Sequence, residues 1–429
     1  MFSENQLIII DLKIGHTSYK TYRNPASAGR STLSICYHLL VEDPSKNERG
    51  EQILYAKIYL ENRSHDHYEK IKEGPFVKPR FGQALTHLPE LGMVIWAFPN
   101  DPVMTHLPEC IDPEKVSKHL PYDKLPSGLD GSEDIDCIET EVIHYRPEIR
   151  CTSRYALKAC KGSESNETVL FGKTFRDDQG IGLYQRSLAL YRANQHDRDS
   201  FLIAQPLGYA GEIKTLWQAG LKGQALVDVL DNKNDEALIE RVGKGLAHFH
   251  RSALTRPLRL TLADHLVEIR KKISKLIPVF PQFESSLKMI AQHLEKEGHQ
   301  LGPAMDTLIH ADFSLQQLLV CGEEIACFDF DEFAMGDPVQ DIANFIVDCH
   351  FRTIDADCIP LIISTFLQAY ERKAGIAICR QRLAWYTQLL FMTKAYRFYL
   401  QQKPNLACEI EWIIARTQDQ IVRHQEAMR

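Results

Sequence analysis

Residues 306–345 of this 429-residue chain read DTLIHADFSLQQLLVCGEEIACFDFDEFAMGDPVQDIANF. Two short apolar runs within this stretch, at 318–320 and 325–328, flank the polar tetrapeptide CGEE (321–324). Apolar runs that are separated by a short polar segment containing glycine are typical of a β-hairpin. The sequence therefore predicts two antiparallel strands here.

Polar side chains lie at both ends of this predicted hairpin. His310 and Asp312 precede it, Gln317 begins it, and Asp329 and Asp331 follow it. Pairing of the two strands should bring Gln317 and Asp329 side by side, with Asp312 one loop away. Two carboxylates and an amide oxygen are hard oxygen ligands of the kind that Mg²⁺ prefers. The alternative, which each residue taken alone would favour, is loop capping and turn chemistry.

The chain outside this stretch divides into β-rich and helical regions. Residues 221–429 are mostly helical, because apolar residues recur there at helical spacing. The predicted helices span 234–254, 261–297, 339–350, 360–374, 378–400 and 406–425. Strand-like runs occur at 33–41, 52–60 and 92–99, and again between 140 and 175, before a helix-like segment at 180–194. A segment rich in Pro, Gly and acidic residues between the two β-rich regions predicts a linker.

The second β-rich region repeats features of the first. Lys57 in LYAKIYL corresponds to Lys173 in LFGKTF, and Tyr37 corresponds to Tyr155. Ile95-Trp96 corresponds in the same way to Leu216-Trp217. These matches indicate an internal duplication of one β-rich unit. The alternative is that two unrelated β-rich segments share common strand residues by chance.

The central stretch also resembles a known family. His310-x-Asp312-x4-Gln317, followed by Asp329 twelve residues later and by FDFDEFAMGDPVQDIANF, resembles the catalytic and metal-binding loops of the aminoglycoside phosphotransferase and choline kinase superfamily. The resemblance extends to Lys173, to WQAGLKGQAL (217–226) and to LAHFH (246–250), and so covers about residues 140–429.

The resemblance implies a protein-kinase-like two-lobe fold of the α+β class, with an antiparallel sheet lobe and a helical lobe. The sheet lobe would span 138–219, and the helical lobe 220–429, with the catalytic segment at 306–341. A β-rich module at 1–118, a possible degenerate copy of the sheet lobe, would precede them, joined by a linker at 119–137. This module would have a docked structural or substrate-gating role.

The family also implies roles for individual residues. Asp312 would be catalytic, because it would orient the acceptor hydroxyl or accept its proton. Metal ligands would be Asp329, Gln317 in the place usually held by Asn, and Asp331 at a second metal or in the loop. Lys173 would hold the α- and β-phosphates, and the hinge-like stretch would contribute Trp217 and Ala219, although core packing is the alternative for the tryptophan. His310 and Asp341 would be structural, bracing the loop or capping the next helix.

Two departures from the family pattern concern the nucleotide. Kinases usually pair the strand lysine with a helical glutamate, but no glutamate occurs between Lys173 and Gly211, and Gln185 lies near the expected place. The hairpin YRPEIRC (145–151) has no glycine, so close backbone approach to phosphate is restricted. We expect Arg146 or Arg150 to supply charge there instead.

The resulting functional expectation is a kinase that transfers the γ-phosphate of ATP or GTP, with Mg²⁺, to a hydroxyl of a small molecule. The family implies a sugar, an amino alcohol or an aminoglycoside-like acceptor, and the acidic chain suits a cationic one. One rival is a pseudokinase that binds nucleotide as a regulatory module, which the substituted Gln317 motivates. A protein kinase is a second rival, and the lack of a recognisable activation segment between Asp329 and Asp341 argues against it.

Composition narrows the cellular setting. The net charge of -7 and a pI near 6.2 do not favour nucleic acid or an anionic membrane surface as partner. The eleven cysteines are scattered, without a CxxC pair or zinc-ligand spacing, which is typical of a reducing compartment. No signal-peptide pattern and no run of 18 apolar residues is found, so we expect a cytoplasmic protein. The sequence does not indicate an oligomeric state.

Overall fold

The computed structural model describes residues 7–20, 31–125, 135–161, 164–194, 199–230, 236–252, 254, 258–352 and 354–427. The chain divides into two compact units. Unit 1 consists of residues 1–184, 207–220 and 400–404, and unit 2 of residues 185–206, 221–399 and 405–429. Both predicted β-rich regions lie in unit 1, and most helices lie in unit 2, so the α+β class is confirmed. Within the described residues, none of the helices has the length and apolar character needed to cross a membrane.

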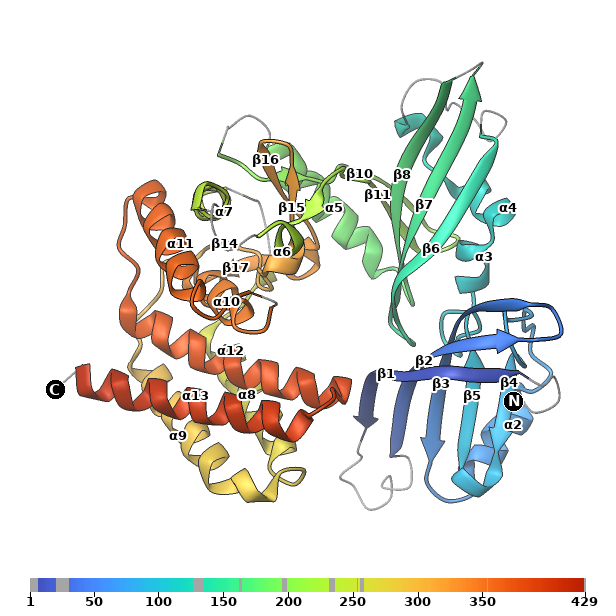
Figure 1. Cartoon of the computed structure of the whole chain (residues 1–429), viewed down its shortest axis with the longest axis horizontal. Helices are drawn as coiled ribbons and strands as arrows, with labels where there is room; N and C mark the ends of the chain where they lie inside the picture. The colour runs from blue at the N-terminus through green and yellow to red at the C-terminus, as the bar shows by residue number, and fades with distance from the viewer. Residues whose placement is uncertain are drawn as a thin grey trace. The chain divides into compact units, whose positions relative to one another are not determined.

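Unit 1 contains two five-stranded sheets with the same strand order. In each sheet the first, second, third, fifth and fourth strands along the chain are neighbours in that sequence. A helix follows the third strand in both, α2 (Arg63–Ile71) in the first copy and α5 (Gln179–Ala193) in the second. The shared topology supports the predicted duplication (Figure 1). The strands are β1 (Ile8–Lys20), β2 (Thr32–Asp43), β3 (Glu48–Tyr59), β4 (Leu85–Leu88) and β5 (Met93–Ala97), then β6 (Cys137–Arg146), β7 (Arg150–Lys161), β8 (Glu164–Phe175), β10 (Pro206–Ala210) and β11 (Thr215–Ala219).

Strand register corrects one part of the predicted correspondence. Lys57 pairs with Val94, and Lys173 pairs with Leu216, so Val94 is the counterpart of Leu216. Trp96 therefore lies on the same face as Lys57, whereas Trp217 lies on the face opposite Lys173. Matching the two tryptophans was wrong by one residue, and a one-residue shift moves a side chain to the other face of a sheet. The match of Tyr37 with Tyr155 is confirmed, because each lies opposite the residue three positions before its lysine.

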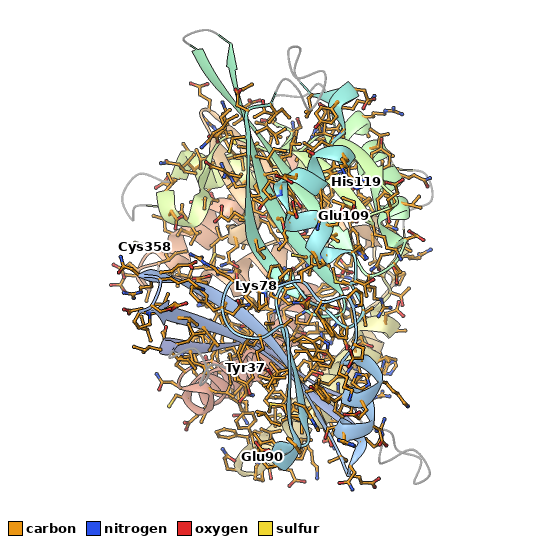
Figure 2. The ribbon with its side chains drawn as sticks, turned by 90° about the vertical axis from the view of Figure 1, so that its right-hand side faces the viewer. Tyr37, Lys78, Glu90, Glu109, His119 and Cys358 are labelled. Carbon is orange, nitrogen blue, oxygen red and sulfur yellow. The ribbon has the colours of Figure 1, made fainter. Side chains whose placement is uncertain are left out.

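The first residues of the predicted linker are part of the core of unit 1. After β5 the chain forms α3 (Leu107–Ile111), α4 (Pro113–Val116) and the short turns η3 (Ser117–His119) and η4 (Tyr122–Lys124). Leu107, Cys110 and Leu120 are buried against residues of the second sheet, and α3 and α4 lie beside β6 in Figure 1. Glu109 of α3 lies 3.3 Å from His119, and both side chains are labelled in Figure 2. Residues 126–134 of the predicted linker are outside the described part of the chain.

Unit 2 is mainly helical, with two small sheets. One sheet has the order β12-β15-β16-β9 and the other β13-β17-β14. The predicted single helix at 261–297 is instead two, α8 and α9, because Pro278 and Pro281 interrupt the helical backbone hydrogen bonds. The helices are α6 (Leu226–Val229), α7 (Glu236–Phe249), α8 (Leu262–Leu276), α9 (Glu284–Gln300), α10 (Val339–Cys349), α11 (Ile359–Ala374), α12 (Arg380–Gln401) and α13 (Leu406–Ala427). The strands are β9 (Leu202–Ile203), β12 (Gln224–Ala225), β13 (Leu258–Arg259), β14 (Thr307–Ile309), β15 (Leu318–Cys321), β16 (Glu324–Cys327) and β17 (Ala334–Gly336).

Candidate active site

The predicted hairpin is confirmed. β15 and β16 pair antiparallel from Leu318 opposite Cys327 to Cys321 opposite Glu324, and Gly322 supplies the positive φ of the turn. One further backbone bond, from Phe328 N–H to the carbonyl of Gln317, extends the pairing beyond the strands. The hairpin therefore places Gln317 next to Phe328, with Asp329 one residue farther along.

The loop before the hairpin is fixed by a buried carboxylate. The backbone N–H groups of His310 and Ala311 donate to the two oxygens of Asp341, at 2.6 and 2.9 Å. Ala311 has a φ of 69°, a left-handed conformation that is uncommon for a residue other than glycine and is held here by these bonds. His310 is fully buried, and its Nε2 lies 3.0 Å from the carbonyl oxygen of Phe328. The loop is thus tied both to the first turn of α10 and to the end of the hairpin.

A histidine that the sequence analysis did not assign to the site completes this support. His250, the residue after α7, has its Nε2 3.1 Å from Asp341 Oδ2 and its Nδ1 2.8 Å from the Tyr370 hydroxyl. Both His250 and Asp341 are buried. The segment LAHFH was noted as part of the family resemblance, but only the fold shows which residue its last histidine contacts.

Both oxygens of the Asp312 carboxylate have a neighbour. Gln317 Nε2 donates to Oδ2 at 3.3 Å, and Arg397 of α12 lies 3.5 Å from Oδ1. The Asp312 side chain nevertheless keeps 37% of its surface exposed. An exposed carboxylate on a rigid loop, held in one orientation, is suited to contact a substrate hydroxyl.

The side-chain oxygen of Gln317 is directed differently from the prediction. It accepts hydrogen bonds from the backbone N–H and the hydroxyl of Ser314, both at 3.1 Å. An amide oxygen has two lone pairs, and both are used here. In this conformation Gln317 positions Asp312 instead of offering a metal ligand, so the predicted ligand role would require its side chain to rotate.

Asp329 and Asp331 lie on either side of a buried anchor. Phe330 packs against His310 and Phe249, with ring centroids 4.7 and 5.5 Å apart. Asp329 has a φ of 63° and precedes the single turn η8 (Phe330–Glu332), and both aspartates are half-buried. In the described part of the chain, no three His, Cys, Asp or Glu side chains are grouped closely enough to hold a metal. The two carboxylates still suit Mg²⁺, which is commonly bound by one or two carboxylates together with phosphate oxygens and water.

The residues predicted to bind nucleotide from the sheet lie in unit 1. Lys173 is buried in β8, paired with Thr152 and Leu216, and Arg150 begins β7 opposite Arg146. Ala219 ends β11 opposite Leu170. Gln185 of α5 belongs to unit 2 and is exposed.

The ring of Trp217 is not available to a ligand. Only 1% of the residue is exposed, and the ring packs edge-on against Tyr155 at 5.0 Å, within the core that includes α3 and α4. The buried ring agrees with core packing, the alternative for Trp217, because its position in the strand directs it to the covered face of the sheet. A backbone contact of residue 217 with nucleotide stays a prediction.

The glycine-free hairpin at 145–151 is held by the N-terminal module. Glu148, at a φ of 60°, forms an ion pair with Lys57 at 2.6 Å. Its backbone N–H and the Tyr145 hydroxyl both donate to Asp101 Oδ2, at 2.9 and 2.6 Å. Glu148 and Asp101 were not among the predicted residues, and no local signal in the sequence marks them.

Comparison with known families agrees with this geometry. Residues 186–386, a little under half of the chain, match the family model described as the phosphotransferase enzyme family, APH. Over these residues the chain is similar to that family. The matched part contains the whole loop and hairpin from His310 to Asp341, and the family supports a small-molecule phosphotransferase. No curated protein is significantly similar to the chain in sequence.

Some solved structures are similar to the chain at low sequence identity. A thermostable mutant of aminoglycoside phosphotransferase APH(4)-Ia is 16% identical, with a TM-score of 0.49, and the match covers 68% of this chain and 95% of that one. A choline/ethanolamine kinase family protein from Mesorhizobium loti is 15% identical, with a TM-score of 0.44 and coverages of 60% and 85%. The gentamicin complex of APH(2″)-IIa is 15% identical, with a TM-score of 0.46 and coverages of 67% and 93%.

Proposed function

We propose that this protein transfers the γ-phosphate of ATP or GTP to a hydroxyl group of a small molecule, with Asp312 as the catalytic residue. The observation that carries the proposal is the exposed Asp312 carboxylate on a loop whose backbone is fixed by buried Asp341. The APH-family match over the same residues supports the reaction class.

In this reaction the acceptor oxygen forms a bond to the γ-phosphorus, and the bond from that phosphorus to the β–γ bridging oxygen breaks. The nucleoside diphosphate leaves, and Asp312 orients the hydroxyl and takes its proton, which then passes to water. Phosphoryl transfer depends mainly on positioning and charge stabilisation. The contacts of Gln317 and Arg397 with Asp312 contribute to positioning, because they hold both carboxylate oxygens.

Asp329 would hold Mg²⁺, with Asp331 as its neighbour in the next turn. The ion would supply charge neutralisation for the phosphates. Lys173 and Arg150 would contribute positive charge toward the phosphates from the sheet, and the backbone near Ala219 would contact the base. We also propose that residues 1–118 are a degenerate copy of the sheet lobe. The same proposal places the protein in the cytoplasm.

The test is a coupled assay of ADP and GDP release over a panel of hydroxyl acceptors. Asp312→Asn should lower kcat roughly 10²- to 10⁴-fold, the range that positioned acid–base groups contribute. Asp355→Asn, at an exposed turn, is the matched control and should keep the full rate. Full activity of the Asp312 variant would show that the catalytic residue has been wrongly assigned.

One observation favours a second candidate function, a pseudokinase that binds nucleotide without turnover. The Gln317 oxygen is occupied by Ser314, so one expected metal ligand is missing from its place. Binding of Mg²⁺–nucleotide, measured by thermal shift, together with no diphosphate release across the panel, would identify that function.

A further inference from the structure

The surface beside Asp312 is lined by cations from two helices of unit 2. Arg397 of α12 lies 3.5 Å from the Asp312 carboxylate. Lys272 of α8 has its Nζ 3.4 Å from the Thr393 hydroxyl. The charges of Arg397 and Asp312 both influence the pKa of Lys272. Burial lowers the pKa of Lys272, and the charge of Arg397 adds to that effect, while Glu268 and Asp312 oppose it. Arg397 thus contacts the reacting carboxylate, and Lys272 is held near it on α8 by its contact with Thr393, one helical turn before Arg397.

A second pair of cations lies next to the first. Arg352 donates to both oxygens of Asp348 at 2.8 and 2.7 Å, and Lys394 approaches the same carboxylate at 3.0 Å. Asp348 is buried, which raises its pKa, but Arg352 and Lys394 outweigh that effect and hold the pKa below its ordinary value. Asp348 also accepts the backbone N–H of Leu315, the residue that follows the catalytic loop. One carboxylate therefore balances two cations directly behind the loop.

The charges named here do not cancel. Arg397 and Lys272 lie near the carboxylate of Asp312, and Arg352 and Lys394 bind the carboxylate of Asp348. Glu268, the other acid near Lys272, is already paired with Lys271 at 2.7 Å. The named groups therefore leave an excess of positive charge beside Asp312, although the whole chain carries a net charge of -7. A cationic acceptor would be repelled by this local field, and an anionic acceptor attracted.

The geometry of Arg397 indicates more than a partner for Asp312. Its contact with the carboxylate is a single one at 3.5 Å, and the side chain is 51% exposed. A guanidinium has five N–H donors in a planar fork that matches a carboxylate or a phosphate. A partner for Asp312 alone would not require a second, half-buried cation nearby, because removing a lysine from water is unfavourable.

We propose that the acceptor is an anionic hydroxyl compound, whose carboxylate or phosphate group binds Arg397 and Lys272 while its hydroxyl contacts Asp312. This inference rests on the proposed phosphotransferase function. It replaces the expectation of a cationic acceptor, which followed from the net charge of the chain. Arg397 and Lys272 are then specificity-determining residues.

The experiment uses hexose acceptors that differ mainly in charge: glucose, glucosamine, gluconate and glucose 6-phosphate. Binding to the full chain is measured by calorimetry with Mg²⁺ and a non-hydrolysable nucleotide analogue, and turnover by diphosphate release. The variants are Arg397→Gln and Lys272→Gln. Lys288→Gln is the matched control, because Lys288 lies on α9 of the same unit, is exposed and pairs with Glu284.

We expect gluconate or glucose 6-phosphate to bind more tightly than glucose, and glucosamine to bind most weakly. Each test variant should weaken binding of the anionic compound and raise its KM roughly 10- to 100-fold, the effect of losing a hydrogen bond to a charged group. Binding of glucose should change less than binding of the anion, and Lys288→Gln should change nothing. Preference for carboxylate over phosphate, or the reverse, distinguishes the two anionic groups.

Tighter binding of glucose or glucosamine than of both anions would overturn the inference, as would anion binding that is equal in the test variants and the control. Turnover of glucosamine in preference to the anions would leave the phosphotransferase function standing and refute only the acceptor class. If no acceptor is phosphorylated, the proposed phosphotransferase function is refuted. The binding data would still show whether Arg397 and Lys272 select anionic compounds.

Discussion

Removal of the Asp341 carboxylate should destabilise unit 2 and release the catalytic loop. Asp341 is fully buried and accepts the backbone N–H groups of His310 and Ala311, besides its contact with His250. In Asp341→Ala each of the two backbone donors, one buried and one half-buried, loses its acceptor, at about 1–3 kcal/mol each. With the buried histidine also left without this partner, we expect a total loss of about 3–5 kcal/mol in the free energy of unfolding.

The conservative variant Asp341→Asn should lose less. Its amide oxygen can still accept one backbone N–H, but its NH₂ group then faces the other donor, so we expect a loss of about 1–3 kcal/mol. His250→Ala combined with Asp341→Ala should cost less than the sum of the two single variants, because both changes remove the same contact.

The assay is urea-dependent hydrogen exchange, followed by mass spectrometry on peptides from unit 2. This readout separates the two units, since a chain of two units need not unfold in one step. Exchange at His310 and Ala311 should accelerate in native conditions, and kcat should fall together with it. Asp355→Ala, at an exposed turn of the same unit, is the control. A loss below 1 kcal/mol in Asp341→Ala, with unchanged exchange at the loop, would refute the argument that this carboxylate fixes the loop.

Three further predictions concern packing, pH and the N-terminal module. Gly243→Ala should destabilise the protein although alanine favours helices, because the new Cβ would lie 2.7 Å from the Phe366 carbonyl oxygen. Gly182→Ala, whose Cβ would have no atom within 4 Å, should instead stabilise the protein by up to about 1 kcal/mol. Thermal unfolding of the two variants tests this difference. Burial lowers the pKa of His265 to about 4, so on acidification the unfolded chain binds this proton before the folded chain does. The His265 contribution to the free energy of unfolding should therefore be complete above about pH 6.5 and fall by up to about 3 kcal/mol toward pH 4. Denaturation experiments across this pH range should show a shallower fall in His265→Phe. Lys57→Met should remove the 2.6 Å ion-pair partner of Glu148, speed hydrogen exchange in the 145–151 hairpin and raise the KM for nucleotide. Adding Glu148→Gln should change little further, because both substitutions remove the same ion pair. Equal KM values in wild type and Lys57→Met would argue against support of the hairpin by Lys57.

The sequence by itself predicted the features that depend on short-range chemistry. The hairpin at 318–327 follows from two apolar runs around a glycine-containing turn, and such a signal is complete within about ten residues. The repeated β-rich units were also visible, because strand residues recur in the same order in both copies. The loop residues His310 and Asp312 were found through their spacing to the hairpin.

Local pattern was a weaker guide to boundaries and register. The proline residues that divide α8 from α9 were present in the predicted single helix, but helical periodicity continued on both sides of them. The two tryptophans looked equivalent until the strand pairing was known, since a shift of one residue is invisible in composition and reverses the face of a strand.

Only the tertiary structure showed which distant side chains meet. His250 and Asp341 are 91 residues apart in sequence, as are Lys57 and Glu148, and Arg397 reaches Asp312 over 85. Such contacts depend on how whole helices and sheets pack, which no local preference encodes. For the same reason the chain's overall acidity pointed toward a cationic acceptor, whereas the fold gathers positive side chains of α8, α12 and the end of α10 beside the catalytic loop. Electrostatic energy falls with distance, so local arrangement outweighs the total charge.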